Sequence, residues 1–386
     1  MGTPAGQDRT GPLAHLKVIE LAGIGPAPMC AMLLADLGAT VLRIDRPEPA
    51  ELGIKRPLEF NFLLRGRDTL PLDLKRPEAR DLVLDLVTQA DGLIEGFRPG
   101  VAERLGLGPE PCLARNKRLV YGRMTGWGQD GPLARTAAHD LNFIALTGAL
   151  AAIGPAGGPP VPPLNLLGDF AGGSLYLAVG MLAAMLEAER SGLGQVVDGA
   201  IVDGVTHLLT SWIGMHRAGM LTGRRGTNVS DGGGYYYSSY ECSDGRYLSV
   251  APIEGKFHDE MLRRMGLDPA EFARQTDPAF WPEARARLAA VFRTRTRDEW
   301  TAVFAGSDAC VAPVLELDEA ERAPHLVARN AYVTIDGVSQ PAPAPRFSRT
   351  VPRTPTGPRQ ADAGAALAGW LPGEAVARHR EAGLLP

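Results

Sequence analysis

The sequence predicts an α/β protein, with a large domain built on a parallel sheet and a smaller α+β domain. Three observations predict this. The chain has 386 residues, which is long for a single hydrophobic core. In the first half, apolar strand-like runs alternate with segments of helical periodicity. After Gly194 the composition changes to glycine-rich and aromatic stretches, which are followed by charged helical ones.

The candidate strands of the large domain are short apolar or β-branched runs. They cover residues 16–22, 39–45, 68–74, 91–97, 118–124 and the beginning of 194–209. Helical periodicity follows the first of them at 26–38 and the third at 76–90, where Pro77 lies near the first turn. Because strands alternate with helices, we expect parallel pairing with right-handed crossovers.

The turn after the first strand, GIGPAP, partly matches the glycine fingerprint of nicotinamide-binding domains. Asp45 also follows at a suitable spacing. The position of the third glycine, however, is occupied by Pro28, which cannot provide the close helix–strand packing for which that glycine is used. The turn therefore favours a tight entry into a helix over a dinucleotide site.

The second half contains a hairpin signal around Ser243–Gly245, with aromatic and β-branched runs on both sides. A proline-rich stretch at 340–358 predicts an extended strap that returns to the first domain. The expected domain bounds are 1–200 for the large domain, 201–224 for a linker helix, 225–325 for the small domain and 326–386 for the C-terminal strap.

Composition argues against several classes of partner. The formal net charge of -4 provides no basic field for nucleic acid or an anionic membrane. The four cysteines lie far apart and the seven histidines are scattered, so neither a disulfide framework nor a metal site is expected. The N-terminus is polar, and the longest apolar run, 174–186, is too short to span a bilayer. We expect a cytoplasmic protein without a membrane span.

Two residues with acid/base side chains precede apolar helical patterns. His139 begins one such pattern and Asp169 begins another, so each is expected at a helix N-terminus near free backbone N–H groups. An ordinary structural role is open for both, because aspartate is a favoured N-cap and a buried histidine is often satisfied by a backbone carbonyl. As a pair, they can instead move a proton to and from a carbon acid.

Five segments resemble the family III CoA-transferase superfamily and, within it, the α-methylacyl-CoA racemases. They are residues 21–47, 94–107, 124–143, 162–174 and 231–250. The resemblance implies a large Rossmann-like domain and a small domain, with two chains interlocked as an obligate homodimer. It also implies an acyl-CoA substrate and no separate cofactor, because CoA is part of that substrate.

The resemblance assigns catalytic roles to His139 and Asp169, and makes Glu254 the partner of the histidine. Glu254 lies in the predicted small domain, so the resemblance places the site between domains of different subunits. The surroundings depart from the family pattern: Pro252 and Gly255 flank Glu254, and Ala138 precedes His139 where the family has glycine. Tyr235 and Ser238 likewise replace a proline and an aspartate around Tyr237.

The resemblance also implies a set of positions that bind the CoA ester, in which basic side chains would hold the phosphates. The set comprises Arg46, Leu72, Asp73, Leu74, Lys75, Gly96, Phe97, Arg98, Arg104, Ala138, Asp140, Leu141, Asn142, Phe143 and Tyr237.

Epimerisation beside a thioester needs two acid/base groups on opposite faces of a planar enolate. Histidine suits this at neutral pH, and a carboxylate does so when its surroundings raise its pKa. We therefore expect an isomerase that interconverts (R)- and (S)-2-methylacyl-CoA thioesters. The alternative is a family III CoA-transferase in which Asp169 is the nucleophile, and His139 argues against it, because the transferase branch lacks this histidine. A non-catalytic acyl-CoA-binding protein is the third hypothesis.

Overall fold

The computed structural model describes residues 10–48 and 53–385; the polar N-terminal residues 1–9 lie outside this part. The described chain divides into two compact units. The large unit contains the described residues of Met1–Thr147 together with Leu164–Leu208 and Val327–Pro386. The second unit contains Gly148–Pro163 and Leu209–Leu326. The sequence predicts one linker helix at 201–224, whereas this division assigns α8 (Ile201–Leu208) to the large unit and α9 (Thr210–Arg217) to the second.

A seven-stranded sheet forms the centre of the large unit in the part of the chain described, and each neighbouring pair of its strands is parallel. The order is β12-β3-β2-β1-β4-β5-β6. The strands are β1 (Lys17–Leu21), β2 (Thr40–Asp45), β3 (Asp68–Pro71), β4 (Gly92–Glu95), β5 (Val120–Thr125), β6 (Val196–Ala200) and β12 (Arg359–Gln360). The predicted parallel sheet is confirmed. The short strand β12 was not expected, and it pairs with β3 at the sheet edge.

The strand order reverses between β1 and β4. The chain builds β1, β2 and β3 outward on one side and then crosses to β4 on the other side of β1. In open α/β sheets, ligands bind outside the carboxyl ends of the strands at such a reversal. The loops that follow β1 and β4 are therefore the first place to look for a site.

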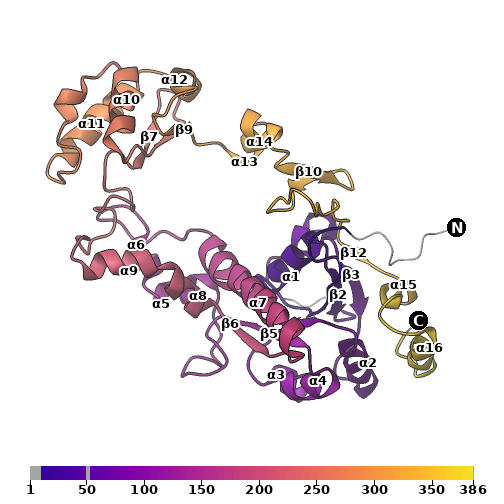
Figure 1. Cartoon of the computed structure of the whole chain (residues 1–386). Helices are drawn as coiled ribbons and strands as arrows, with labels where there is room; N and C mark the ends of the chain where they lie inside the picture. Colours follow the sequence, from indigo (N-terminus) through magenta and orange to yellow (C-terminus); the bar gives the residue numbers. More distant parts are fainter. Residues whose placement is uncertain (1–9, 49–52, 386) are drawn as a thin grey trace. The chain divides into compact units, whose positions relative to one another are not determined.

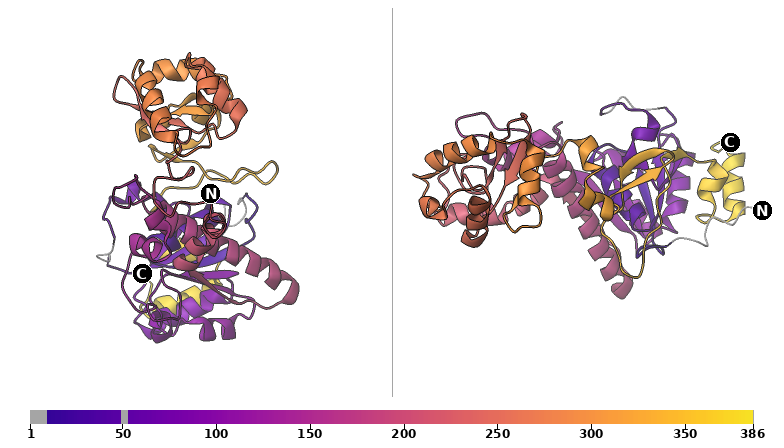
Figure 2. Two further views of the ribbon diagram at one scale, coloured as in Figure 1. Left: turned by 90° about the vertical axis from the view of Figure 1, so that its left-hand side faces the viewer. Right: turned by 90° about the horizontal axis from the view of Figure 1, so that it is seen from above.

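Helices cover both faces of the sheet. On one face, α2 (Pro77–Val87), α4 (Pro109–Arg115), α15 (Ala363–Leu367) and residues flanking α16 (Gly373–Glu381) contribute to one buried apolar cluster. On the other face, α1 (Pro26–Asp36) and α7 (Tyr176–Ser191) contact each other, and α7 packs on β5 and β6. Figure 1 shows this division, and Figure 2 shows the yellow C-terminal helices beside the purple ones of the large unit.

A π-helical segment, η3 (Leu166–Leu175), runs directly into α7. Within the described residues, the combined stretch Leu166–Ser191 is long and apolar enough to cross a membrane by length and composition. The sequence expectation considered the apolar run 174–186 alone, and the helix that contains this run is longer because η3 precedes α7. Nearly half of its most apolar window is buried inside the structure, and core helices of soluble proteins pass the same test.

The remaining elements of the large unit lie near the sheet ends or along the C-terminal segment. They are η1 (Leu58–Phe60), η2 (Phe62–Leu64), α3 (Val101–Arg104), α5 (Asp140–Leu146), and the antiparallel pair β10 (Tyr332–Ile335) and β11 (Val338–Pro341).

The second unit is an α+β structure, as predicted. Its antiparallel sheet contains β7 (Ser238–Glu241), β8 (Tyr247–Val250) and β9 (Val311–Pro313), and the predicted hairpin is the β7–β8 pair. Its helices are α6 (Ala149–Ala152), α9, α10 (Gly255–Arg264), η4 (Pro269–Phe272), α11 (Trp281–Phe292), α12 (Arg297–Phe304), α13 (Leu317–Ala320) and α14 (Pro324–Ala328), the last of which crosses into the large unit. Aromatic side chains such as Tyr235, Phe292 and Trp300 fill its core.

Candidate active site

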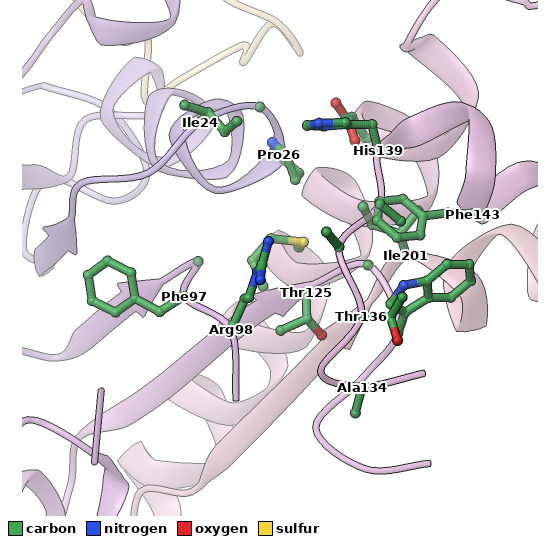
Figure 3. A pocket seen from close by; sticks show the side chains of 18 of the residues that line it. Ile24, Pro26, Phe97, Arg98, Thr125, Ala134, Thr136, His139, Phe143 and Ile201 are labelled. Carbon is green, nitrogen blue, oxygen red and sulfur yellow. The ribbon is translucent and has the colours of Figure 1, made fainter. Parts of the chain in front are cut away.

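A cavity of about 330 Å³ lies in the large unit at the carboxyl ends of the strands. The start of α1, the loops after β4 and β5, and the start of α5 all contribute to its wall, and Figure 3 shows His139 and Phe143 on one side with Phe97 and Arg98 on another. Seven predicted site residues line it: Gly96, Phe97, Arg98, Ala138, His139, Phe143 and Asp169. We call this space the reaction cavity.

Asp169 does not cap a helix. The segment η3 begins at Leu166 with Asn165 in the N-cap position, so Asp169 lies in its first turn. The interpretation of Asp169 as an N-cap is therefore wrong. Its Oδ2 atom accepts a long hydrogen bond from Nδ2 of Asn165, at 3.4 Å. The carboxylate is thus held locally while it lines the reaction cavity.

Gly25 leaves the space that the Asp169 carboxylate occupies. This glycine precedes α1 with φ at 63°, in the left-handed region that glycine adopts without strain. A Cβ atom at this position would lie 3.1 Å from Oδ2 of Asp169. The glycine turn after β1, which resembles part of a dinucleotide fingerprint, therefore makes room here for a side-chain carboxylate.

The surroundings of Asp169 raise its pKa to about 6. Burial is the largest cause, and the negative charge of Asp140 adds to it. The hydrogen bond from Asn165 and the nearby His139 act in the opposite direction. A carboxyl group with this pKa exchanges a proton readily near neutral pH, as acid/base catalysis requires.

His139 occupies the N-cap position of α5, with an extended backbone and an exposed side chain. Its backbone N–H donates to Oδ1 of Asn142 at 3.1 Å, which fixes the start of the helix. The alternative interpretation, a buried histidine bound to a carbonyl group, is therefore wrong. The imidazole lines the same cavity as Asp169.

Three other predicted residues of α5 lie outside the cavity lining. Asp140 is half-buried, and its Oδ1 atom accepts the backbone N–H of Asp169 at 2.6 Å. Asn142 holds the backbone of His139, whereas the Leu141 side chain is exposed. Asp140 and Asn142 thus position the two acid/base residues rather than forming the wall.

A second cavity, of about 630 Å³, lies at the ends of β2 and β3. It gathers the predicted residues Arg46, Leu72, Asp73, Leu74 and Lys75, and Phe97 lines both cavities. We call it the nucleotide cavity, after the nucleotide part of CoA that the family resemblance predicts there; Arg46 and Lys75 would suit its phosphates and lie among the acidic Asp45, Glu48 and Asp73. Arg104 is exposed at the end of α3 and lines neither cavity.

Glu254 and Tyr237 belong to the second unit. Glu254 is exposed at the N-cap position of α10, and its carbonyl oxygen accepts the N–H groups of Phe257 and His258. Tyr237 is half-buried beside the fully buried Tyr235, whose hydroxyl pairs with Nε2 of His258 at 2.8 Å. Tyr235, one of the departures from the family pattern, therefore packs in the core of this unit.

Several lining residues were not anticipated. Thr125 ends β5 and is followed by Gly126 and Trp127, and a Cβ atom on Gly126 would lie about 2 Å from the ring of Phe143. Their position at the carboxyl end of a predicted parallel strand could have indicated that they line a site. Among the described residues, no group of three or more His, Cys, Asp or Glu side chains could hold a metal ion.

The family model for CoA-transferase family III matches residues 13–363. The chain belongs to CoA-transferase family III. The family resemblance of the five sequence segments is thereby confirmed.

Similar proteins of known name and structure support this membership. This family III chain is 42% identical over 354 residues to alpha-methylacyl-CoA racemase of Mus musculus, covering 91% of this chain and 90% of the mouse protein. Alpha-methylacyl-CoA racemase of Homo sapiens is 39% identical over 339 residues, covering 88% of this chain and 87% of the human protein. A CAIB/BAIF family protein from Brucella suis has a similar solved structure, with a TM-score of 0.78, 26% identity, and 93% and 98% of the two chains covered.

Proposed function

We propose that this family III protein is an isomerase that interconverts (R)- and (S)-2-methylacyl-CoA thioesters. The observation that carries this proposal is the reaction cavity, in which His139 and Asp169 lie together and the pKa of Asp169 is raised to about 6. The relatives named as alpha-methylacyl-CoA racemases, at 42% and 39% identity, support the same reaction.

In the proposed reaction, one acid/base residue removes the α-proton and the bonding electron pair moves into the thioester carbonyl, forming an enolate. The other residue, in its protonated form, then donates a proton to the opposite face of that carbon. For one direction Asp169 starts as the carboxylate and His139 as the imidazolium, and for the reverse direction the protonation states are exchanged. Each turnover moves one proton on and one proton off the substrate, so the reaction needs no cofactor.

The CoA portion would extend from the reaction cavity into the nucleotide cavity. Arg46 and Lys75 line the latter, and Phe97 lines both, so an arm that runs past Phe97 would join the thioester to the phosphates. Arg98 lines the reaction cavity and adds a further cation on this path.

The alternative is a CoA-transferase in which the Asp169 carboxylate attacks the thioester. One feature of the cavity disfavours it: a transferase needs no acid/base group such as His139 beside its nucleophile.

The proposal includes an obligate homodimer in a cytoplasmic location, in which Glu254 of one chain would orient His139 of the other. An apolar stripe along η3 and α7 supports a partner surface: Leu175, Val179 and Leu186 are 46%, 67% and 63% exposed. A large exposed apolar surface on a soluble chain is typical of an interface.

The test is the fate of the α-hydrogen. Purified protein is incubated with (S)-2-methylacyl-CoA in deuterated water, and chirality and deuterium content are followed together. We expect racemisation accompanied by deuterium incorporation at the α-carbon. Acyl transfer to added acids without deuterium incorporation, together with an acyl group on Asp169 trapped by hydroxylamine, would contradict the proposal.

A further inference from the structure

Buried acid–arginine pairs span neighbouring strands at the carboxyl end of the sheet. Glu20 on β1 stands opposite Arg43 on β2 and is hydrogen-bonded to it, and Glu95 on β4 stands opposite Arg123 on β5. Both glutamates are fully buried. Burying a charged side chain costs desolvation free energy, so a buried ion pair contributes little net stability even when each carboxylate oxygen has a partner. We therefore consider a role for these pairs beyond stability.

Glu95 uses both carboxylate oxygens as acceptors. Oε1 accepts from Nε of Arg123 at 2.9 Å, and Oε2 accepts the backbone N–H of Phe97 at 2.6 Å. Arg123 in turn bonds Oε1 of Glu103 on α3 through Nη1, at 2.8 Å. The carboxylate therefore ties the loop after β4 to the neighbouring strand.

Phe97 is the residue common to the two cavities. It lines the reaction cavity with Gly96 and Arg98, and it lines the nucleotide cavity with Arg46 and Lys75. The loop is also packed closely against α1, since a Cβ atom on Gly96 would lie 3.2 Å from Cβ of Ala27. The position of the Phe97 backbone therefore affects the wall of both cavities.

We propose that Glu95 is a positioning residue for the CoA substrate: its buried carboxylate fixes the Phe97 backbone, and the Gly96–Arg98 loop then holds the CoA arm where it passes from one cavity to the other. This inference rests on the proposed function only in taking a CoA ester as the ligand. Glu95 itself lines neither cavity, so it acts through the Phe97 loop.

The geometry requires a carboxylate. A glutamine side chain has one acceptor oxygen and an NH₂ group that only donates. In the Glu95→Gln variant, the N–H of Phe97 or the Nε–H of Arg123 would face another donor, and the loop would have to move. Burial raises the pKa of Glu95 to about 6, so the comparison is made at a pH well above that value.

The experiment compares Glu95→Gln with the matched variant Glu103→Gln, which removes a negative charge beside the same arginine but leaves the Phe97 bond intact. Each protein is assayed with a 2-methylacyl-CoA and with the same acyl group on N-acetylcysteamine, a thioester too short to reach the nucleotide cavity. We expect Glu95→Gln to raise KM for the CoA ester about tenfold, the size of one lost hydrogen bond to a charged group, with kcat nearly unchanged.

The short thioester separates positioning from a general structural role. We expect Glu95→Gln to change kcat/KM for the short thioester little. We expect Glu103→Gln to leave kcat/KM for both the short thioester and the CoA ester nearly unchanged. An equal loss of kcat/KM with both substrates, or an unchanged KM for the CoA ester, would overturn the inference.

Two measurements do not depend on turnover. Calorimetric titration with free CoA should show about tenfold weaker binding by Glu95→Gln, even if the protein proves not to be a racemase. In the wild-type protein, hydrogen exchange of the Phe97 amide should be slow, which requires no variant to fold. Equal CoA affinities, or exchange of that amide at the rate of an unprotected one, would defeat the positioning role.

Discussion

Oδ1 of Asp140 accepts the backbone N–H of Asp169 at 2.6 Å, so the residue that follows one acid/base group holds the other in place. Gly168 permits this contact, because a Cβ atom there would lie 2.2 Å from the same oxygen. The start of α5 and the first turn of η3 are thereby joined. The backbone segments that carry His139 and Asp169 are thus held next to each other.

Replacing Asp140 by asparagine should shift the acid limb of activity to lower pH. The charge of Asp140 raises the pKa of Asp169, so its removal lowers that pKa, while the asparagine oxygen still accepts the backbone N–H. Activity that needs the Asp169 carboxylate is lost as the pH falls through its pKa, about 6 in the parent protein. The pH dependence of kcat/KM measures the shift, and Asp203→Asn, an exposed change on α8, is the control. An acid limb that stays in place would contradict the coupling.

Asp169→Asn and His139→Ala should each abolish racemisation, because a complete turnover needs a proton carrier on both faces. Each variant should still exchange the α-proton of one enantiomer with deuterated water, and the preferred enantiomer should differ between the two. Proton NMR of the separated enantiomers follows this exchange. Full racemisation by His139→Ala would instead favour a single-residue mechanism.

Gly25→Ala should lower kcat strongly. The added methyl group would lie 3.1 Å from Oδ2 of Asp169 and displace the carboxylate, and the Gly25 backbone, with φ of 63° and ψ of -115°, is one that other residues rarely adopt. Gly192→Ala is the control for a positive φ alone, since Gly192 has φ of 77° with nothing within 4 Å of the added atom. Gly25→Ala should lose more thermal stability than Gly192→Ala, and only Gly25→Ala should lose activity. Equal activities would mean that the carboxylate tolerates displacement.

Arg46→Ala and Lys75→Ala should weaken binding of the CoA ester more than they slow its conversion. Both side chains line the nucleotide cavity, away from the reacting carbon, so we expect KM to rise by about three- to tenfold with kcat nearly constant. Arg104→Ala, which alters a predicted binding residue outside both cavities, should have a smaller effect. Steady-state kinetics on one substrate measures all three. The reverse ranking would place the phosphates near α3.

The active species should be a dimer, because Glu254 lies in the second unit and is proposed to act on His139 of another chain. Light scattering during dilution, with activity measured in parallel, tests this. We expect activity to fall as the dimer dissociates, since obligate partners rarely have a stable monomer. A folded and active monomer would contradict the interlocked arrangement.

The order of strands and helices was predictable because the signals for strands and helices come from residues close together in the sequence. Apolar runs such as 16–22 and 39–45 carry the strand signal, and Pro77 marks a helix start, so the alternation alone indicates a parallel sheet. The family resemblance likewise singled out Arg46, Lys75 and Phe97 by their residue types and positions.

The tertiary structure decided what those residues do together. Asp169 and Gly25 are far apart in the chain, and only the packing of η3 beside α1 brings the carboxylate to the glycine. That packing also removes water from the carboxyl group, which is the main reason for its raised pKa. Glu95 lies in the family segment 94–107 but was not singled out there, because its role depends on pairing with Arg123 on the adjacent strand and on the fold of the Phe97 loop. Burial and strand pairing are long-range properties, and local sequence patterns do not encode them.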